Sequence, residues 1–367
     1  MTDNDIEVVV SNKDRYFKID KIKNGTVLLR KKKHWRIPGG LCCVYKYRLQ
    51  DGSESALRIW KTEISESKKR SNAIAEYLRS LRSPYFVDFE YIEDAFTYNG
   101  NLHPVILMDW CDGDKLKKYI YDNVNNPHKI EELASSILSM IYQMHKYGIS
   151  HGDLQHDNIL VKKNGSVVLI DYDTMYVPQL RGYKDESGGY PGYQHPSARQ
   201  KNKILSPKVD YFSELILYLS IQAIAQNTSL LTKYLVEEQD KSMLFTMYDF
   251  DNLRSSKIYK DVKKLGGKFK ILLDILELYL SKNDINDLEP FYVIAQRMGL
   301  ELPESTIIEI ETDTNSILKR WGTGTKETDT NDSKKTVSLF CTKCSKRFSD
   351  RDNYCINCGK ERSQLKI

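Results

Sequence analysis

Three polar side chains near the middle of the chain have the residue types and the spacing that phosphoryl transfer needs. Asn158 lies five residues after Asp153, and Asp171 lies thirteen residues further on. One carboxylate can orient and deprotonate a hydroxyl group, while an amide oxygen and a second carboxylate can hold Mg²⁺ over the phosphates of a nucleotide. We therefore predict that Asp153 is the base or hydroxyl-positioning residue and that Asn158 and Asp171 are the Mg²⁺ ligands.

The elements around these side chains are expected to bring them together. An amphipathic helical stretch, 130–147, precedes the loop, and a short strand follows Asn158. After an Asn-Gly turn, the apolar strand 166–170 ends directly before Asp171. Asp and Asn in loops are usually turn residues, but this combined spacing between two short strands favours a catalytic loop.

The segment that begins at His151 resembles the catalytic loop of the protein kinase superfamily. It reads His-Gly-Asp-Leu-Gln-His-Asp-Asn in place of H-R-D-x-x-x-x-N, and Asp-Tyr-Asp at 171–173 stands in place of the metal-binding D-F-G. The resemblance covers about half of the chain, from about Gly39 to Ser220, and is closest to a bacterial group of eukaryotic-like kinases. It implies an α+β, bilobal fold, with an antiparallel β-sheet and one helix in the N-lobe and a mainly helical C-lobe.

The resemblance also implies where ATP binds. On a strand at 55–61, Ala56 would lie against the adenine and Arg58 would reach the α/β-phosphates. Glu76, on the helical stretch that follows, would be the ion-pair partner of Arg58. Lys61 is the alternative cation if the strand register slips, and an exposed helix charge is the alternative for Glu76. A reduced glycine-rich loop and the hinge supply the other expected nucleotide-binding residues: Gly39, Gly40, Val44, Met108, Asp109 and Cys111.

The segment 189–197 separates a protein kinase from other phosphotransferases. Four of its residues fall in register with the G-T-P-E-Y-x-A-P-E segment that closes a kinase activation loop: Gly189, Pro191, Tyr193 and Pro196. Asp210 further resembles the buried Asp that begins the large C-lobe helix and supports the catalytic loop. Aminoglycoside and choline kinases lack this segment, so the resemblance favours a protein over a small molecule as the phosphoryl acceptor.

Four departures from the kinase motifs bear on activity. The N-lobe cation is Arg58 in place of Lys, and guanidinium is bulkier and planar. Gln155 stands in place of the catalytic-loop Lys, and losing such an electrostatic stabiliser can cost about 3 kcal/mol. Asp173 replaces the Gly of D-F-G, and Gly152 replaces the Arg that usually clamps a phosphorylated activation loop. Because of Gly152, we expect activity that does not depend on activation-loop phosphorylation.

The function implied is ATP- and Mg²⁺-dependent transfer of the γ-phosphoryl group to Ser/Thr hydroxyls of a protein, with catalysis by Asp153, Asn158, Asp171 and Gln155. Because the base and both metal ligands remain, slow catalysis is favoured over none. A nucleotide-binding pseudokinase that serves as a scaffold or regulator is the main alternative. A small-molecule phosphotransferase is a weaker one.

The end of the chain carries two CxxC pairs within eighteen residues: Cys341, Cys344, Cys355 and Cys358. This spacing suits a tetrahedral Cys₄ zinc site; two disulfides or a redox pair are the alternatives. The segment resembles the zinc ribbons of bacterial regulatory proteins, in which metal ligation supplies most of the stability, on the order of 10 kcal/mol. We expect it to recruit a protein substrate or regulator. Its basic charge also admits nucleic acid, although a solvated basic face is the commoner explanation.

Composition limits the other classes. Of the 367 residues, 40% are hydrophobic and 29% charged, which is enough to bury a core and excludes a wholly disordered or fibrous protein. The acidic start carries no secretory signal pattern, and apolar runs stay below about 18 residues, so a cytoplasmic protein without membrane contact is expected. The expected domains are an N-lobe with an N-terminal extension (1–110), a C-lobe (111–305), a polar linker (306–338) and a zinc ribbon (339–367).

Overall fold

The computed structural model describes residues 1–62, 66–185, 189–198, 203–234 and 242–303. The chain divides into two compact units, Met1–Ile307 and Ile308–Ile367, and all described residues belong to the first. The predicted linker and zinc ribbon, with its four cysteines, lie outside the described residues.

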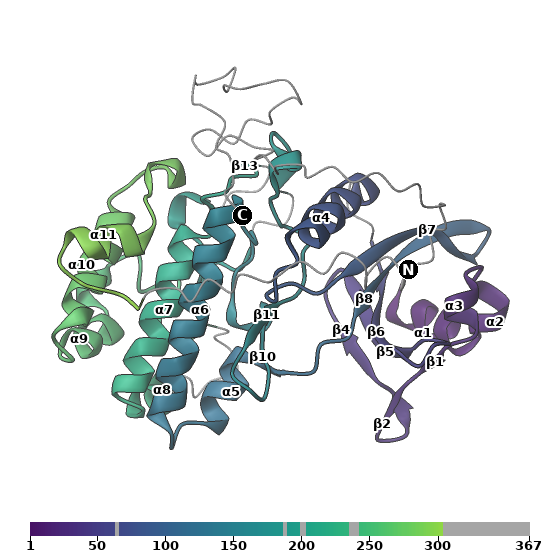
Figure 1. Cartoon of the computed structure of the whole chain (residues 1–367), viewed down its shortest axis with the longest axis horizontal. Coiled ribbons are helices and arrows are strands. Elements are labelled where there is room, and N and C mark those ends of the chain that lie inside the picture. The colour runs from purple at the N-terminus through teal and green to yellow at the C-terminus, as the bar shows by residue number, and fades with distance from the viewer. Residues whose placement is uncertain (63–65, 186–188, 199–202, 235–241, 304–367) are drawn as a thin grey trace, which may run out of the picture. The chain divides into compact units, whose positions relative to one another are not determined.

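The N-lobe is built on an antiparallel sheet in the order β1-β5-β6-β8-β7, with β4 paired to β5 (Figure 1). Its strands are β1 (Thr26–Val27), β4 (Arg36–Pro38), β5 (Cys42–Arg48), β6 (Glu54–Trp60), β7 (Phe89–Tyr98) and β8 (Asn101–Asp109). Within β6 the apolar Leu57 and Ile59 are buried. Because side chains alternate along a strand, Ala56 and Arg58 share the other face, so the register places Arg58 and not Lys61 as the inner cation.

Helices at the beginning of the chain pack on the N-lobe sheet. They are α1 (Asp3–Ser11), α2 (Lys13–Tyr16) and α3 (Asp20–Lys23). A capping box between Thr2 and Asp5 satisfies the first turn of α1. Ile6 and Phe17 then join a buried cluster that includes Tyr45 of β5. The predicted N-terminal extension is thus an integral part of the N-lobe core, ahead of a short hairpin formed by β2 (Leu29–Arg30) and β3 (Lys33–His34).

The helix α4 (Ser67–Leu81) belongs to the N-lobe, and the chain leaves the sheet at Asp109 to enter a mainly helical C-lobe (Figure 1). The C-lobe helices are α5 (Leu116–Asp122), α6 (Pro127–Tyr147), α7 (Tyr211–Gln226), α8 (Ser229–Tyr234), α9 (Lys257–Lys263), α10 (Lys268–Leu280) and α11 (Phe291–Arg297). α6 begins earlier than predicted because the Asn126 side chain caps it and Pro127 suits its first turn. It ends at Tyr147, and Gly148 caps it with a φ of +64°.

Small strands and 3₁₀ turns complete the C-lobe and carry the predicted catalytic segments. β9 (Asp114–Lys115), β10 (Ile159–Val161) and β11 (Val167–Leu169) form one antiparallel sheet, and β12 (Lys184–Asp185) pairs with β13 (Lys203–Ile204). The 3₁₀ turns are η1 (His156–Asn158), η2 (Pro178–Leu180), η3 (Pro196–Ala198), η4 (Leu253–Ser255) and η5 (Ile285–Asp287). The two short strands predicted around the Asn-Gly turn are therefore β10 and β11, paired through Leu160 and Val168.

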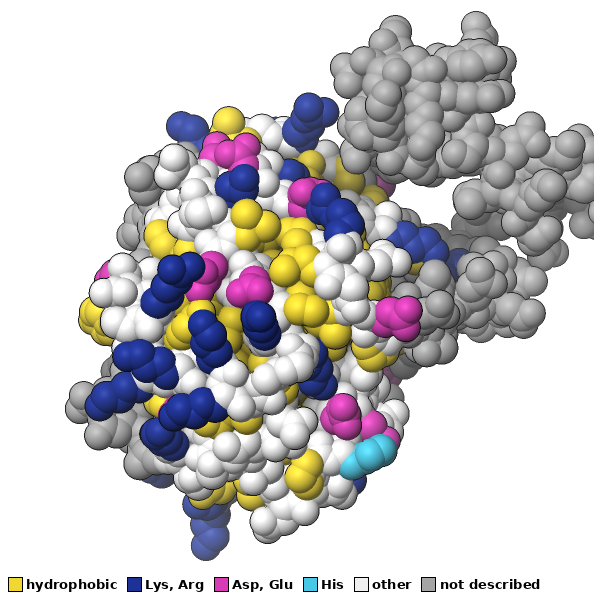
Figure 2. Space-filling view, turned by 90° about the vertical axis from the view of Figure 1, so that its left-hand side faces the viewer, with side chains coloured by type: hydrophobic (Ala, Val, Ile, Leu, Met, Phe, Trp, Pro, Cys, Tyr) yellow, Lys and Arg dark blue, Asp and Glu magenta, His cyan; other side chains and the backbone are white. Residues whose placement is uncertain are grey.

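The core of the C-lobe centres on α7, which is buried along almost its whole length and packs against α6. Figure 2 shows the end of the lobe formed by α9, α10 and α11, where basic side chains surround apolar ones. No helix in the described part of the chain combines the length and the apolar character that crossing a bilayer requires.

Candidate active site

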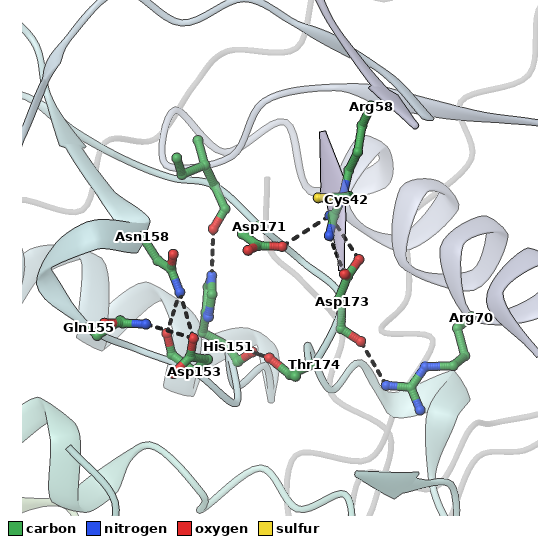
Figure 3. A network of polar contacts seen from close by, with 11 residues as sticks. Cys42, Arg58, Arg70, His151, Asp153, Gln155, Asn158, Asp171, Asp173 and Thr174 are labelled. Atoms are coloured by element: carbon green, nitrogen blue, oxygen red, sulfur yellow. Dashed lines mark hydrogen bonds and ion pairs between the residues drawn. The ribbon is translucent and has the colours of Figure 1, made fainter. Parts of the chain in front are cut away.

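The loop between α6 and β10 holds the Asp153 carboxylate in a network of hydrogen bonds (Figure 3). Asp153 Oδ2 accepts from Gln155 Nε2 at 2.8 Å and from Asn158 Nδ2 at 3.0 Å. The same Asn158 nitrogen donates to the Asp153 carbonyl at 2.8 Å. Because the amide nitrogen is turned inward, the Asn158 amide oxygen is the atom that can face a cation.

Backbone amides of this loop donate hydrogen bonds to the Asp210 side chain. Asp210 is fully buried and accepts hydrogen bonds from the amides of His151 and Gly152, the latter at 3.0 Å. Burial, and secondly the Glu214 carboxylate, raise the pKa of Asp210 from 3.8 to about 8. The prediction that Asp210 supports the catalytic loop is confirmed by these contacts.

The segment 189–196 packs against the catalytic loop, as expected for the end of an activation loop. The Tyr190 amide donates to Asp153 Oδ1 at 2.7 Å, and Gln194 Nε2 donates to the Gly152 carbonyl at 3.1 Å. Tyr193 is fully buried, and its hydroxyl lies 2.7 Å from His156 Nδ1. This segment therefore helps to fix the orientation of the Asp153 carboxylate.

The metal motif follows β11 and is anchored by its central tyrosine. The buried Tyr172 hydroxyl donates to the Leu169 carbonyl at 2.7 Å and accepts from the Val87 amide at 2.9 Å. Asp171 has a φ of +67°, a left-handed conformation that non-glycine residues adopt uncommonly and that clusters at functional sites. With Tyr172 anchored between them, Asp171 and Asp173 both reach the guanidinium of Arg58 (Figure 3).

Arg58 is 8% exposed and is surrounded by acceptors. Its Nη1 donates to Asp171 Oδ1 at 3.0 Å and to Asp173 Oδ1 at 2.9 Å, and its Nη2 donates to the second Asp173 oxygen. Its Nε lies 3.1 Å from Cys42 Sγ. Burial alone would lower the pKa of Arg58, but the Asp171 and Asp173 carboxylates raise it above its ordinary value. Burial raises the pKa of Asp173, and Arg58 opposes that rise.

The predicted ion pair between Arg58 and Glu76 is wrong. Glu76 lies on α4 with its side chain exposed, and among the described residues the carboxylates that bind Arg58 are Asp171 and Asp173. The α4 residue that reaches the metal motif is the buried Arg70, whose Nη2 donates to the Asp173 carbonyl at 2.8 Å. Glu76 lies six positions after Arg70, so at about 100° per residue the two side chains leave the helix on different faces.

The other predicted nucleotide-binding residues lie on neighbouring strands and at the hinge. Val44 pairs with Arg58 across β5 and β6, and Ala56 pairs with Met108 across β6 and β8. All but Arg58 are partly exposed on this face. Asp109 and the half-buried Cys111 follow at the hinge, where the Asp109 amide donates to the Asp88 carbonyl at 2.9 Å.

The expected glycine-rich loop is a short turn between β4 and β5. The Gly39 amide donates to the Cys42 carbonyl at 2.9 Å. Gly39 and Gly40 are both exposed, and a Cβ on Gly40 would meet no atom within 4 Å. The turn is therefore open to solvent at the point where backbone amides could approach a phosphate.

The donor set suits Mg²⁺ bound together with nucleotide phosphates. Mg²⁺ in such sites takes one or two carboxylates and completes its shell with phosphate oxygens and water. Here the Asn158 amide oxygen and Asp171 would hold it. The Asp171 side chain is 49% exposed, so it can reach a bound ion. No cluster of three or more His, Cys, Asp or Glu side chains suited to a metal occurs in the described part of the chain.

The two-lobed fold and the set of Asp153, Asn158 and Asp171 define the protein kinase class. A family model described as the protein kinase domain matches residues 38–274. The chain therefore belongs to the protein kinase family, as the sequence motifs predict.

Curated relatives are distant and much longer. A hormonally up-regulated neu tumor-associated kinase homolog of Xenopus laevis is 24% identical over 156 residues, 41% of this chain and 24% of the relative. The serine/threonine-protein kinases SMU1 of Mycosarcoma maydis and STE20 of Debaryomyces hansenii are each 23% identical, over 48% and 58% of this chain and 22% and 20% of their own lengths. The chain thus spans about a quarter or less of these relatives.

Sequence reasoning missed two groups in the site. One is Arg70, which gave no signal beyond being a basic residue early in α4; the other is the Tyr190 amide, a backbone group that no side-chain motif reveals. Asp173 departs from the kinase pattern in the sequence, but the motif does not predict its pairing with Arg58. The available signal is that Asp173 lies two residues after Asp171. When the residue between them, Tyr172, is anchored in the core, both carboxylates can contact the same cation.

Proposed function

We propose that this chain is an ATP- and Mg²⁺-dependent protein kinase that phosphorylates Ser or Thr hydroxyls. The observation that carries the proposal is the geometry around Asp153. Its carboxylate is oriented by Gln155, Asn158 and the Tyr190 amide. Two relatives named as serine/threonine-protein kinases support the choice of acceptor.

In the proposed reaction, Asp153 orients the acceptor hydroxyl and takes its proton as the oxygen attacks the γ-phosphorus of ATP. The bond between the γ-phosphorus and the bridging oxygen breaks, and ADP leaves. The Asn158 amide oxygen and Asp171 would hold Mg²⁺, which would supply charge neutralisation on the phosphates. Arg58 binds the α/β-phosphates, and the Gln155 amide is a neutral donor near the transferred group. Catalysis comes mostly from positioning and electrostatic stabilisation.

The rest of the nucleotide site follows the strand pairing. Ala56 and Val44 would enclose the adenine from β6 and β5, while Met108 limits the depth of the pocket. The Asp109 carbonyl and the Cys111 amide would bind the base, and Gly39 and Gly40 would lie over the phosphates. The exposure of these residues on one face of neighbouring strands supports this assignment.

A nucleotide-binding scaffold without transfer activity is the second candidate, and one contact favours it. Arg58 Nη1 lies 3.0 Å from Asp171 Oδ1, so a side-chain cation already neutralises part of the carboxylate expected to bind Mg²⁺. Gln155 in addition brings no charge to the transferred phosphoryl group. In this case the fold would bind nucleotide and regulate a partner protein.

Radiolabelled ATP with Mg²⁺ and an acceptor protein separates the two candidates. The kinase proposal expects label on protein with the wild-type chain and at least a hundredfold less with Asp153→Ala. Equal labelling by both proteins, or none by either, contradicts it. Label on free sugars or choline, and not on protein, would instead indicate a metabolite kinase.

We also propose that the C-terminal cysteines bind one zinc ion and that this segment recruits a protein substrate or regulator. The support is the spacing of the two CxxC pairs, Cys341 with Cys344 and Cys355 with Cys358. Metal analysis of the full chain should give one Zn²⁺ per molecule. A value near zero after purification without chelators contradicts the proposal.

A further inference from the structure

We propose that Asp173 is the positioning residue for Arg58 and takes the role that the family pattern gives to a carboxylate on the N-lobe helix. This inference rests on the proposed function, because it concerns the cation that binds the α/β-phosphates. The metal motif would then supply a magnesium ligand from Asp171 and the partner of the phosphate-binding cation from Asp173.

The first support is the geometry of the pair. Arg58 reaches both oxygens of Asp173 through two different nitrogens, with Nη1 to Oδ1 at 2.9 Å. Such a two-pronged contact fixes the plane of the guanidinium, which a point-like ammonium would not need. The side chains of Arg58 and Asp173 are only 10% and 18% exposed, so bulk water and salt screen the pair weakly.

The second support is that Asp173 is itself held from two sides. Its carbonyl accepts a hydrogen bond from Arg70 Nη2 at 2.8 Å, and Arg70 Nη1 donates to the Lys184 carbonyl at 2.9 Å. The next residue, Thr174, donates through Oγ1 to the His151 carbonyl at 2.9 Å. Figure 3 shows Arg70, Asp173 and Arg58 in one connected series. Arg70 of α4 is thus linked to Arg58 through Asp173, by a hydrogen bond to the Asp173 carbonyl. In the family pattern, a carboxylate on the helix would make this link directly.

The third support is the face that α4 turns toward the site. Arg70 is 5% exposed and points at the metal motif, while Glu76 lies in solvent. A carboxylate at position 70 would face the Asp173 carbonyl and repel it. None of the buried residues of α4 is acidic, so the carboxylate partner of Arg58 comes from another element, and Asp173 provides it.

A competing role for Asp173 is that of a further magnesium ligand. Both of its oxygens already accept hydrogen bonds from Arg58, which disfavours this role. The two roles predict different energetics, because a positioning residue acts only through Arg58 whereas a metal ligand acts independently of it.

A double-mutant cycle on the full chain tests this role. With ATP, Mg²⁺ and dephosphorylated casein, Asp173→Asn should lower kcat/KM tenfold to a hundredfold. Arg58→Ala should lower it at least a hundredfold, and the double variant should lie within twofold of Arg58→Ala. A further tenfold loss in the double variant, or a raised Mg²⁺ requirement in Asp173→Asn, overturns the proposal in favour of a metal ligand.

Glu76→Gln is the matched comparison, since it removes the carboxylate that the family pattern would use. It should stay within twofold of the wild type. A loss equal to that of Asp173→Asn overturns the proposal. Should Asp173→Asn fail to fold by circular dichroism, Asp173→Glu replaces it with the same expectation, because the longer side chain keeps the charge but shifts the guanidinium.

Calorimetric titration with ADP in EDTA gives a readout that needs neither metal nor transfer. Asp173→Asn should weaken ADP binding at least threefold when Arg58 is present, and less than 1.5-fold in the Arg58→Ala background. Equal weakening in both backgrounds overturns the positioning role. If the wild type binds ADP but transfers no phosphate, the proposed function fails while this cycle still decides the role of Asp173.

Discussion

At Gly152 the backbone has a φ of +81°, and a Cβ would lie 2.3 Å from the Thr174 carbonyl oxygen. No larger residue fits there without moving the catalytic loop or the segment after the metal motif. The Arg that other kinases place at this position is thus excluded by local geometry, which supports the expectation that an activation-loop phosphate is not needed.

Replacing Gly152 by Ala should lower the free energy of unfolding by about 2–5 kcal/mol, the sum of a left-handed backbone penalty and overpacking. Urea denaturation measures the change. Gly40→Ala is the control, because a Cβ there meets no atom within 4 Å, and it should stay within about 0.5 kcal/mol of the wild type. Equal effects of the two substitutions would contradict the close approach at Gly152.

The buried Asp210 carboxylate should make stability depend on pH. Its pKa is raised from 3.8 to about 8, chiefly by burial, so between these values the folded protein holds a proton that the unfolded chain has released. The contribution is therefore complete at low pH and is lost as the pH rises through about 8, with a slope of at most about 1.4 kcal/mol per pH unit.

Urea denaturation from pH 5.5 to 9 measures this slope. Asp210→Asn removes the titrating group, so the variant should lose less stability over this range than the wild type, although it is less stable at pH 5.5. Parallel pH profiles for the two proteins would show that Asp210 does not bind a proton in the folded state.

At the scale of elements, the N-terminal helices complete the core of the N-lobe. α1 turns Ile6 into the cluster that contains Tyr45 and Leu57 of the sheet, whereas Val8, two residues on, is 37% exposed. The sheet that carries Arg58 and leads to the hinge is thus packed against a helix that lies outside the kinase motifs. This explains why the chain folds its N-lobe around a segment that precedes the family match at residue 38.

Ile6→Ala should lower the free energy of unfolding by about 2–5 kcal/mol, because it leaves a cavity in a fully buried cluster. Val8→Ala on the same helix should change it by no more than about 0.5 kcal/mol. Thermal or urea denaturation of both variants gives the comparison. Similar losses from both would mean that α1 does not pack on the sheet as described.

At the scale of the whole molecule, side chains from both lobes meet at the proposed nucleotide site. Arg58 and Arg70 come from the N-lobe, while Asp171, Asp173 and Asn158 come from the C-lobe. A ligand bound to both sets stabilises their arrangement by mass action. Because Asp171 is assigned to the metal and Asp153 to the acceptor hydroxyl, substitutions within the C-lobe should separate nucleotide binding from transfer.

Mg²⁺-ADP at about 100 times its dissociation constant should stabilise the wild type by about 2.7 kcal/mol. Asp153→Ala should keep most of the rise in melting temperature, because Asp153 is assigned to the acceptor hydroxyl and not to the metal. Asp171→Asn should lose most of it. Differential scanning fluorimetry measures the three proteins, and a full shift in Asp171→Asn would remove Asp171 from the metal site.

The sequence by itself determined the groups that are held by short connections. Asp153, Asn158 and Asp171 lie in loops bounded by short strands, so their spacing along the chain limits how far apart they can be. Asp210 is recognisable because it directly precedes a long apolar helix. The strand that carries Arg58 is predicted from the period-two pattern of its side chains. Its register in the structure places Arg58, and not Lys61, on the inner face, as expected.

Only the tertiary structure decided which carboxylate pairs with Arg58. Asp173 is 115 residues away along the chain, and Glu76 is much nearer, yet Asp173 makes the contact. The choice depends on the rotation of α4 about its axis, which turns Arg70 inward and leaves Glu76 in solvent. That rotation is set by the packing of the whole buried face of the helix, a sum of many small contacts that no local pattern records.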